Sequence, residues 1–168
     1  MQRHLQDSRN FNGRVEKIDQ PGQLLDGGDV LKCPATNRVY VGLSDRTSHE
    51  GISRLQAILP NHDVVAIPTT KALHLKSTIT ALPDGTIIGY EPVIDDSSMF
   101  GSFLSMPEEA GAHVVILDDN ELLMSSSAPE SIAILEGKGF RVHPVDIEQF
   151  EKLEGCVTCL SVRYRNCF

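Results

Sequence analysis

The sequence predicts an α/β fold built from repeated units of strands and helices. Short runs rich in Val, Ile and Leu, with the length of buried strands, alternate with stretches whose apolar residues recur at helical spacing. Two strand–helix–strand–strand units are offset by roughly 80 residues, a distance at which repetition suggests a rotationally repeated architecture. The chain of 168 residues is long enough to bury a core, and we expect one domain over residues 1–168.

The first half of the chain predicts several strands and a helix. Residues 48–59 are expected to be helical because their apolar residues share one face, with Ser48 as the N-cap. Pro-Asp-Gly at 83–85 predicts the turn of a hairpin. The strands are expected at 39–43, 64–67, 77–82 and 86–90.

The second half predicts the same kinds of element. A turn at 118–120 separates two strands, and a helix over 129–136 begins near Pro129 and is closed by two glycines. A short helix at 147–153 precedes the last strand. The strands are expected at 113–117, 121–124, 141–145 and 157–164.

Each of the two similar units closes on a strand that begins beside a chemically active side chain. His74 opens the final strand of the first unit, and Cys159 lies at the start of the equivalent strand in the second unit. If the units surround a pseudo-symmetry axis, these two side chains converge near it.

Composition excludes some classes of protein. The net charge of −8 argues against a nucleic-acid binder, which needs basic surface to displace counterions. No apolar run approaches the roughly 20 residues that span a bilayer. The polar N-terminus lacks the apolar core of a signal peptide, so we expect a cytosolic protein whose four cysteines are free thiols.

Cys156 and Cys159 form a C-x-x-C motif that has three interpretations. A zinc site would normally require a second ligand pair at similar spacing, which Cys33 and Cys167 do not supply. A redox pair usually opens a helix, whereas residues 157–164 are expected to form a strand in which the two thiols point to opposite faces. We therefore favour one working thiol, Cys159, although a lone cysteine in a strand is more often simply buried.

Other candidate residues have both a structural and a chemical interpretation. His74 is either a core histidine or a general acid and base, since imidazole titrates near neutral pH. Asp26 and Asp29 flank two glycines and are either solvated loop acids or part of a site. Arg46 follows a buried strand and is either a surface ion pair or a bidentate clamp on a carboxylate.

In order, these segments resemble the motif set of the dimethylarginine dimethylaminohydrolase family. The segments are LDGGDVL (25–31), VGLSDRT (41–47), LHLKS (73–77) and GCVTCLSV (155–162), and the resemblance runs from about Gly22 to Tyr164. It implies that Cys159 is the nucleophile and His74 the general acid and base. Asp26 would be the acid beside the histidine, Arg46 would hold the α-carboxylate of the substrate, and Leu153 would offer its backbone carbonyl to the substrate's amino group.

The resemblance also implies a fold and a reaction. The family has a five-bladed α/β propeller, the pentein fold, of which this chain would supply about three ββαβ-type blades. The implied reaction is hydrolysis of Nω-methylated arginines to citrulline and methylamine or dimethylamine through a covalent thiouronium, without metal or cofactor. The substrate would be a small molecule, with no nucleic-acid or membrane partner.

The family's chains begin well before the LDGGD segment. That earlier part supplies roughly two blades, an acidic residue for the guanidinium, a further arginine and a lid. The alternatives are therefore another guanidine-modifying enzyme, such as an arginine deiminase or amidinotransferase, or an inactive truncated fragment. An incomplete propeller would leave sheet surfaces open, so self-association is a reasonable expectation.

Overall fold

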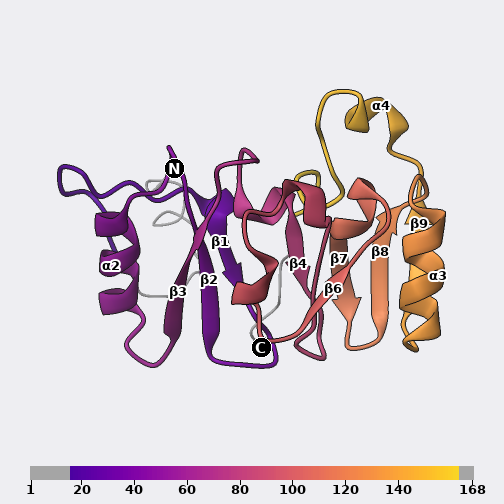
Figure 1. Ribbon diagram of the computed structural model, residues 1–168, viewed down its shortest axis with the longest axis horizontal. Helices are drawn as coiled ribbons and strands as arrows, with labels where there is room; N and C mark the ends of the chain where they lie inside the picture. The colour runs from indigo at the N-terminus through magenta and orange to yellow at the C-terminus, as the bar shows by residue number, and fades with distance from the viewer. Residues whose placement is uncertain (1–15, 163–168) are drawn as a thin grey trace, which may run out of the picture.

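The computed structural model describes residues 16–162 and arranges them as three similar three-stranded sheets along the long axis of the molecule (Figure 1). In every sheet the first two strands are antiparallel, and the second and third are parallel. The strand orders are β1-β2-β3, β4-β5-β6 and β7-β8-β9. The α/β architecture is therefore present, with the three repeated units that the family resemblance implied.

The first sheet contains β1 (Val30–Lys32), β2 (Arg38–Leu43) and β3 (Asp63–Pro68). Helix α2 (His49–Ile58) provides the crossover that the parallel β2–β3 pair requires. The hydroxyl of Ser48 accepts a hydrogen bond from the Gly51 backbone N–H, which confirms Ser48 as the N-cap. The helix packs its apolar face through Ile52 against buried valines of β2.

The second sheet contains β4 (Ile79–Ala81), β5 (Ile87–Gly89) and β6 (Phe103–Ser105). The predicted hairpin joins β4 to β5, and Gly85 supplies a left-handed backbone with a φ of 87° in its turn. The crossover to β6 has no α-helix. It uses two short 3-10 helices, η3 (Glu91–Val93) and η4 (Ser97–Met99).

The third sheet contains β7 (Val114–Asp118), β8 (Glu121–Ser125) and β9 (Arg141–Val145). Helix α3 (Pro129–Gly137) connects the parallel β8 and β9, as predicted. A short helix, α4 (Glu148–Glu151), follows and is briefer than the predicted 147–153. No helix in the described part of the chain is long and apolar enough to cross a membrane.

The last predicted strand, 157–164, is wrong over its described part. Residues 157–160 form a turn, closed by the Leu160 N–H donating to the Cys156 carbonyl at 3.1 Å. The Ser161 N–H also donates to the carbonyl of Thr158 at 3.3 Å. Residues 163 and 164 lie outside the described range. The backbone groups of this segment thus bond locally instead of to a neighbouring strand.

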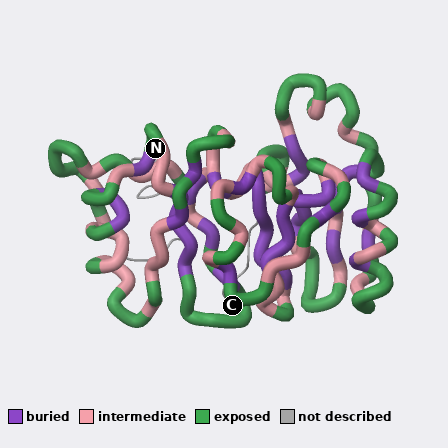
Figure 2. The backbone as a smooth tube through the Cα atoms, in the orientation of Figure 1, coloured by how far each residue is buried: buried purple, intermediate pink, exposed green. Residues whose placement is uncertain are grey.

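The first strand of every sheet faces a common groove. This open groove has a volume of about 1220 Å³, and its lining includes residues of β1, β4 and β7. Buried residues concentrate in the strands, while the connecting loops are mostly exposed (Figure 2). Three units that direct equivalent strands at one central space have the geometry of propeller blades around an axis.

Candidate active site

Three sequence-predicted side chains meet where three connecting segments come together. Asp26 is the N-cap of the 3-10 helix η1 (Gly27–Asp29), Arg46 lies after β2, and His74 precedes the 3-10 helix η2 (Leu75–Ser77). Asp26 Oδ2 lies 3.2 Å from His74 Nε2 and 3.7 Å from an Arg46 guanidinium nitrogen. The structure therefore places one carboxylate between an imidazole and a guanidinium.

The Asp26 carboxylate is held in its ionised form by its surroundings. The Gly28 backbone N–H donates to Asp26 Oδ1 at 2.8 Å, and this bond lowers the pKa of the carboxyl below its ordinary value. Partial burial opposes that shift, whereas His74 and Arg46 reinforce it. The ionised Asp26 carboxylate places a negative charge beside the His74 ring.

The His74 ring is packed against a backbone segment that has no side chain. A Cβ atom added at Gly28 would lie 2.5 Å from His74 Cγ, closer than real contacts allow. The ring's Nε2 is at ion-pair distance from Asp26, but its direction falls outside good hydrogen-bond geometry, so the contact is mainly electrostatic. His74 is only partly buried, between an exposed Leu73 and a buried Leu75. This differs from a fully buried core histidine.

Asp29 was expected to be either a solvated acid or a site residue, and it is fully buried. Its carboxylate accepts hydrogen bonds from the hydroxyls of Ser44 and Thr47, at 2.9 Å and 2.7 Å, and from the Leu75 N–H at 2.9 Å. Thr47 Oγ1 in turn accepts from the Asp26 N–H at 3.0 Å. Asp29 thus joins the three segments that carry Asp26, Arg46 and His74. The sequence signal was its place immediately before a buried strand.

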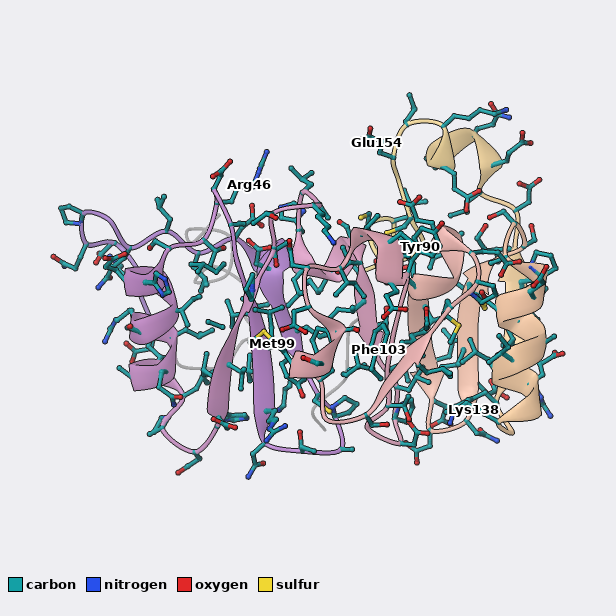
Figure 3. The ribbon with its side chains drawn as sticks, in the orientation of Figure 1. Arg46, Tyr90, Met99, Phe103, Lys138 and Glu154 are labelled. Atoms are coloured by element: carbon teal, nitrogen blue, oxygen red, sulfur yellow. The ribbon has the colours of Figure 1, made fainter. Side chains whose placement is uncertain are left out.

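Arg46 is an exposed residue at the upper edge of the molecule in Figure 3. Its side chain is 54% exposed, and its 3.7 Å contact with Asp26 is weaker than a bidentate pair. The guanidinium therefore remains available to an anionic ligand. Its assignment as a carboxylate clamp stays a prediction.

The two thiols of the C-x-x-C motif lie side by side, contrary to the expectation that they face opposite ways. Cys156 Sγ is 3.2 Å from Cys159 Sγ, because the segment forms a turn and not a strand. Cys156 is buried and Cys159 is exposed. Burial of the thiol group, together with the neighbouring Cys156, raises the pKa of Cys159, and the positive charge of Lys76 acts in the opposite direction.

The Cys159 turn lies close to the segment that carries His74. Lys76, two residues after His74, lines the same groove as Thr158, which precedes Cys159. The described contacts of the Cys159 side chain are with Cys156, so the structure brings Asp26, His74 and Arg46 together and places Cys159 in a neighbouring turn. Sequence analysis did not single out Lys76.

Leu153 lies in the loop between α4 and the Cys159 turn. The residue is 81% exposed, so its apolar side chain contributes little to packing. Glu154, labelled in Figure 3, has a left-handed backbone with a φ of 61°, which costs a non-glycine residue about 1 kcal/mol. The predicted role of the Leu153 carbonyl remains a prediction. Within residues 16–162, no group of three or more His, Cys, Asp or Glu side chains could hold a metal ion.

Comparisons with known proteins identify the family and the fold of the chain. The family model described as arginine deiminase matches residues 4–142. A dimethylarginine dimethylaminohydrolase of Streptomyces coelicolor is 52% identical over 156 residues, which are 92% of this chain and 59% of that protein. One from Pseudomonas aeruginosa is 26% identical, over 93% of this chain and 62% of its own length.

A solved structure of a Pseudomonas aeruginosa dimethylarginine dimethylaminohydrolase, a cysteine-to-serine mutant complexed with citrulline, has the same fold. Its TM-score is 0.77 at 27% identity, covering 92% of this chain and 61% of that one. The chain thus spans about 60% of the length of the relatives it matches. It belongs to the arginine deiminase family of guanidine-modifying enzymes, with the pentein fold, and within that family it resembles the dimethylarginine dimethylaminohydrolases.

Proposed function

We propose that this chain contributes the nucleophile and the acid–base pair for hydrolysis of Nω-methylated arginines to citrulline and methylamine or dimethylamine. The observation that carries the proposal is the Asp26–His74–Arg46 cluster. It lies in a chain that is 52% identical to a dimethylarginine dimethylaminohydrolase. The cytosol is the proposed compartment, since the chemistry requires a reduced thiol.

The first chemical step is attack by the Cys159 thiolate on the guanidino carbon. Burial raises the pKa of Cys159, so little thiolate is present in the free protein at neutral pH. A bound guanidinium brings a positive charge to the thiol and favours the ionised form. The nucleophile is therefore generated mainly when a cationic substrate is present.

His74 then transfers two protons in sequence. Protonated His74, stabilised by the Asp26 carboxylate, donates to the departing amine, because an amine leaves poorly as an anion. The product on Cys159 is a cationic S-alkylthiouronium. Neutral His74 next deprotonates a water molecule, which attacks the same carbon and breaks the carbon–sulfur bond. Citrulline leaves and the thiolate is restored.

Arg46 and Leu153 have binding roles in this proposal. The Arg46 guanidinium pairs with the substrate's α-carboxylate, which does not change during the reaction. Arg46 therefore contributes to KM more than to kcat. The Leu153 carbonyl accepts a hydrogen bond from the α-amino group.

A citrulline assay with asymmetric dimethylarginine and arginine as alternative substrates tests the proposal, and transfer of the amidino group from arginine to glycine is measured as guanidinoacetate. We expect Cys159→Ser to abolish citrulline formation from dimethylarginine, while Cys156→Ser keeps most of it. The assay is run on the chain itself and on a version extended to the length of its relatives. Turnover of arginine alone would identify an arginine deiminase, and an inactive chain beside an active extended form would identify a fragment that needs completion.

A further inference from the structure

The turn at 156–161 holds two thiols in contact. The Sγ atoms of Cys156 and Cys159 are 3.2 Å apart, about 1 Å longer than a covalent disulfide bond. The Leu160 N–H bond to the Cys156 carbonyl fixes the two residues on one turn. Thr158 Oγ1 lies 3.0 Å from Cys156 Sγ and keeps that sulfur beside its partner.

We propose that Cys156 and Cys159 form a reversible disulfide when the protein meets a hydroperoxide. Exposed Cys159 reacts first: its sulfur attacks the hydroperoxide, a sulfur–oxygen bond forms, the oxygen–oxygen bond breaks, and a sulfenic acid results together with the alcohol of the hydroperoxide, or with water where the oxidant is hydrogen peroxide. Cys156 then loses its proton and attacks the sulfenic sulfur, a sulfur–sulfur bond forms, and the sulfenic oxygen leaves as water. Two thiols lose two electrons and the peroxide gains two, so the reaction is balanced.

The assignment of roles follows from exposure, while the raised pKa of Cys159 makes its reaction with the oxidant slow at neutral pH. Cys159 is exposed and meets the oxidant, whereas Cys156 is buried, and its described sulfur contacts are Thr158 and Cys159. Cys33 is buried in the core between the first and second sheets, with residues such as Tyr40 and Ile79. A buried resolving thiol next to an exposed one captures the sulfenic acid before it is oxidised further.

The consequence for catalysis rests on the proposed function, while disulfide formation itself does not. If Cys159 is the nucleophile, the disulfide removes it from the reaction and also protects it from irreversible oxidation. A dithiol returns both sulfurs to the active form. The site would thus be inactivated by oxidant and reactivated by reductant.

Peptide mapping tests the proposal on the whole chain without any assay of activity. Trypsin cleaves after Lys152 and Arg163, so residues 153–163 form one peptide with both thiols, separate from those of Cys33 and Cys167. The protein is treated with hydrogen peroxide, alkylated with iodoacetamide and digested. We expect the 153–163 peptide to be unalkylated and two hydrogens lighter, and to become doubly alkylated after dithiothreitol.

Variants separate this disulfide from other oxidation products. Cys33→Ala and Cys167→Ser should leave the disulfide unchanged, while Cys156→Ala should accumulate about tenfold more sulfinic acid on Cys159 that dithiothreitol does not reverse. Cys156→Ser provides a second variant if the alanine form does not fold, as judged by circular dichroism. An alkylated Cys156 after full oxidation of Cys159 in the native chain, or a link to Cys167, would overturn the proposal.

Discussion

Gly28 determines where the His74 ring can lie, so it offers a way to move the imidazole without removing it. A Cβ at Gly28 would collide with the ring, whereas a Cβ at the adjacent Gly27 would meet nothing within 4 Å. We expect Gly28→Ala to lower the rate of citrulline formation by about 10²-fold, because a ring displaced by an ångström loses proton-transfer geometry. Gly27→Ala is the matched control and should turn over normally.

His74→Ala shows how much rate is lost when the imidazole is removed completely, against which the rates of Gly28→Ala and Gly27→Ala are compared. Loss of the acid and base should cost about 10²–10⁴-fold in rate, with substrate binding retained in a titration. Acid-quenched mass spectrometry shows whether the adduct on Cys159 still forms. If Gly28→Ala and Gly27→Ala are equally active while His74→Ala is not, the ring's packing against Gly28 does not position it.

The Cys159 thiol should react slowly at neutral pH. Its pKa is raised above the ordinary value of 9.0, mainly by burial and by Cys156, so the reactive thiolate is a minor species at pH 7. The groups that act on it are Cys156 and the positive charge of Lys76. We expect the rate of Cys159 alkylation by iodoacetamide to rise with pH and to level off only above pH 9, followed by mass spectrometry.

A bound cation should change the pH dependence of Cys159 alkylation. A guanidinium ligand that does not react is expected to move the midpoint to lower pH, since it stabilises the thiolate. A plateau already below pH 8 in the free protein would show that the thiol is activated without substrate, contrary to the proposed first step.

At the scale of the elements, Asp29 ties the segments after β2 and β3 to η1. Asp29→Ala would leave the buried Leu75 N–H and the Ser44 and Thr47 hydroxyls without their acceptor. We expect the free energy of unfolding to fall by roughly 3 kcal/mol or more, from denaturant titration. Asp45→Ala, an exposed acid in the same loop, is the control and should change it by less than about 0.5 kcal/mol.

Helix α3 obtains its N-terminal cap from a distant segment. Its N-cap residue, Ala128, has no side-chain cap, and the Glu108 carboxylate instead accepts from the N–H groups of Glu130 and Ser131 and from the Ser131 hydroxyl. Burial raises the pKa of Glu108, but these hydrogen bonds outweigh it, so the net pKa is lowered. The cap is therefore strongest when Glu108 is ionised.

Replacing this cap should make stability less dependent on pH. Glu108→Gln is expected to lower the free energy of unfolding by about 1 kcal/mol at pH 7. Because the folded pKa is depressed below the ordinary 4.5, the wild-type advantage is present above that pH and disappears as pH falls through the folded value. Glu109→Gln, on the exposed neighbour, is the control. An advantage for wild type that persists at pH 2 would contradict the capping role.

Most elements could be predicted because their signals are local. Residues 39–43 became β2, and residues 48–59 became α2 with its Ser48 cap, since strand runs, helical periodicity and caps are set by neighbours in sequence. Residues 157–162 carry the same kind of β-prone pattern, yet the turn follows from hydrogen bonds that no periodicity reveals. Strand β6, with three residues, is too short to show a period.

The site was harder to predict than the fold. Asp29 finds its partners 15, 18 and 46 residues away, so its burial is a tertiary property. The meeting of Asp26, Arg46 and His74 was predicted only through family resemblance, because they lie on separate connections. The side-by-side thiols were missed since the strand assignment placed them on opposite faces.

At the scale of the whole molecule, the central groove is the surface that this chain leaves open. Residues of β1, β4 and β7 line it together with Thr158, Ser161 and Val162. Half-exposed Leu117 and almost fully exposed Val162 add apolar surface there. In relatives of which this chain spans about 60%, further chain is available to complete the circle of blades. We expect two copies of the 168-residue chain to associate through the same surface.

Supplying the rest of the propeller should therefore restore activity and reduce self-association. We expect co-expression with the part of the Streptomyces coelicolor relative that lies outside the matched 156 residues to raise citrulline formation at least about 10²-fold over the chain alone. The reason is that orienting a delocalised guanidinium requires groups on more than one side of it, while this chain supplies the Asp26–His74 pair and the Cys159 turn.

Light scattering should show a defined two-part complex in place of self-association. The same mixture with Cys159→Ser is the control, because it should assemble equally well and form no citrulline. Full activity of the isolated chain would contradict this prediction, and so would assembly without any gain in rate. Either result would show that citrulline formation by the three units does not require further blades.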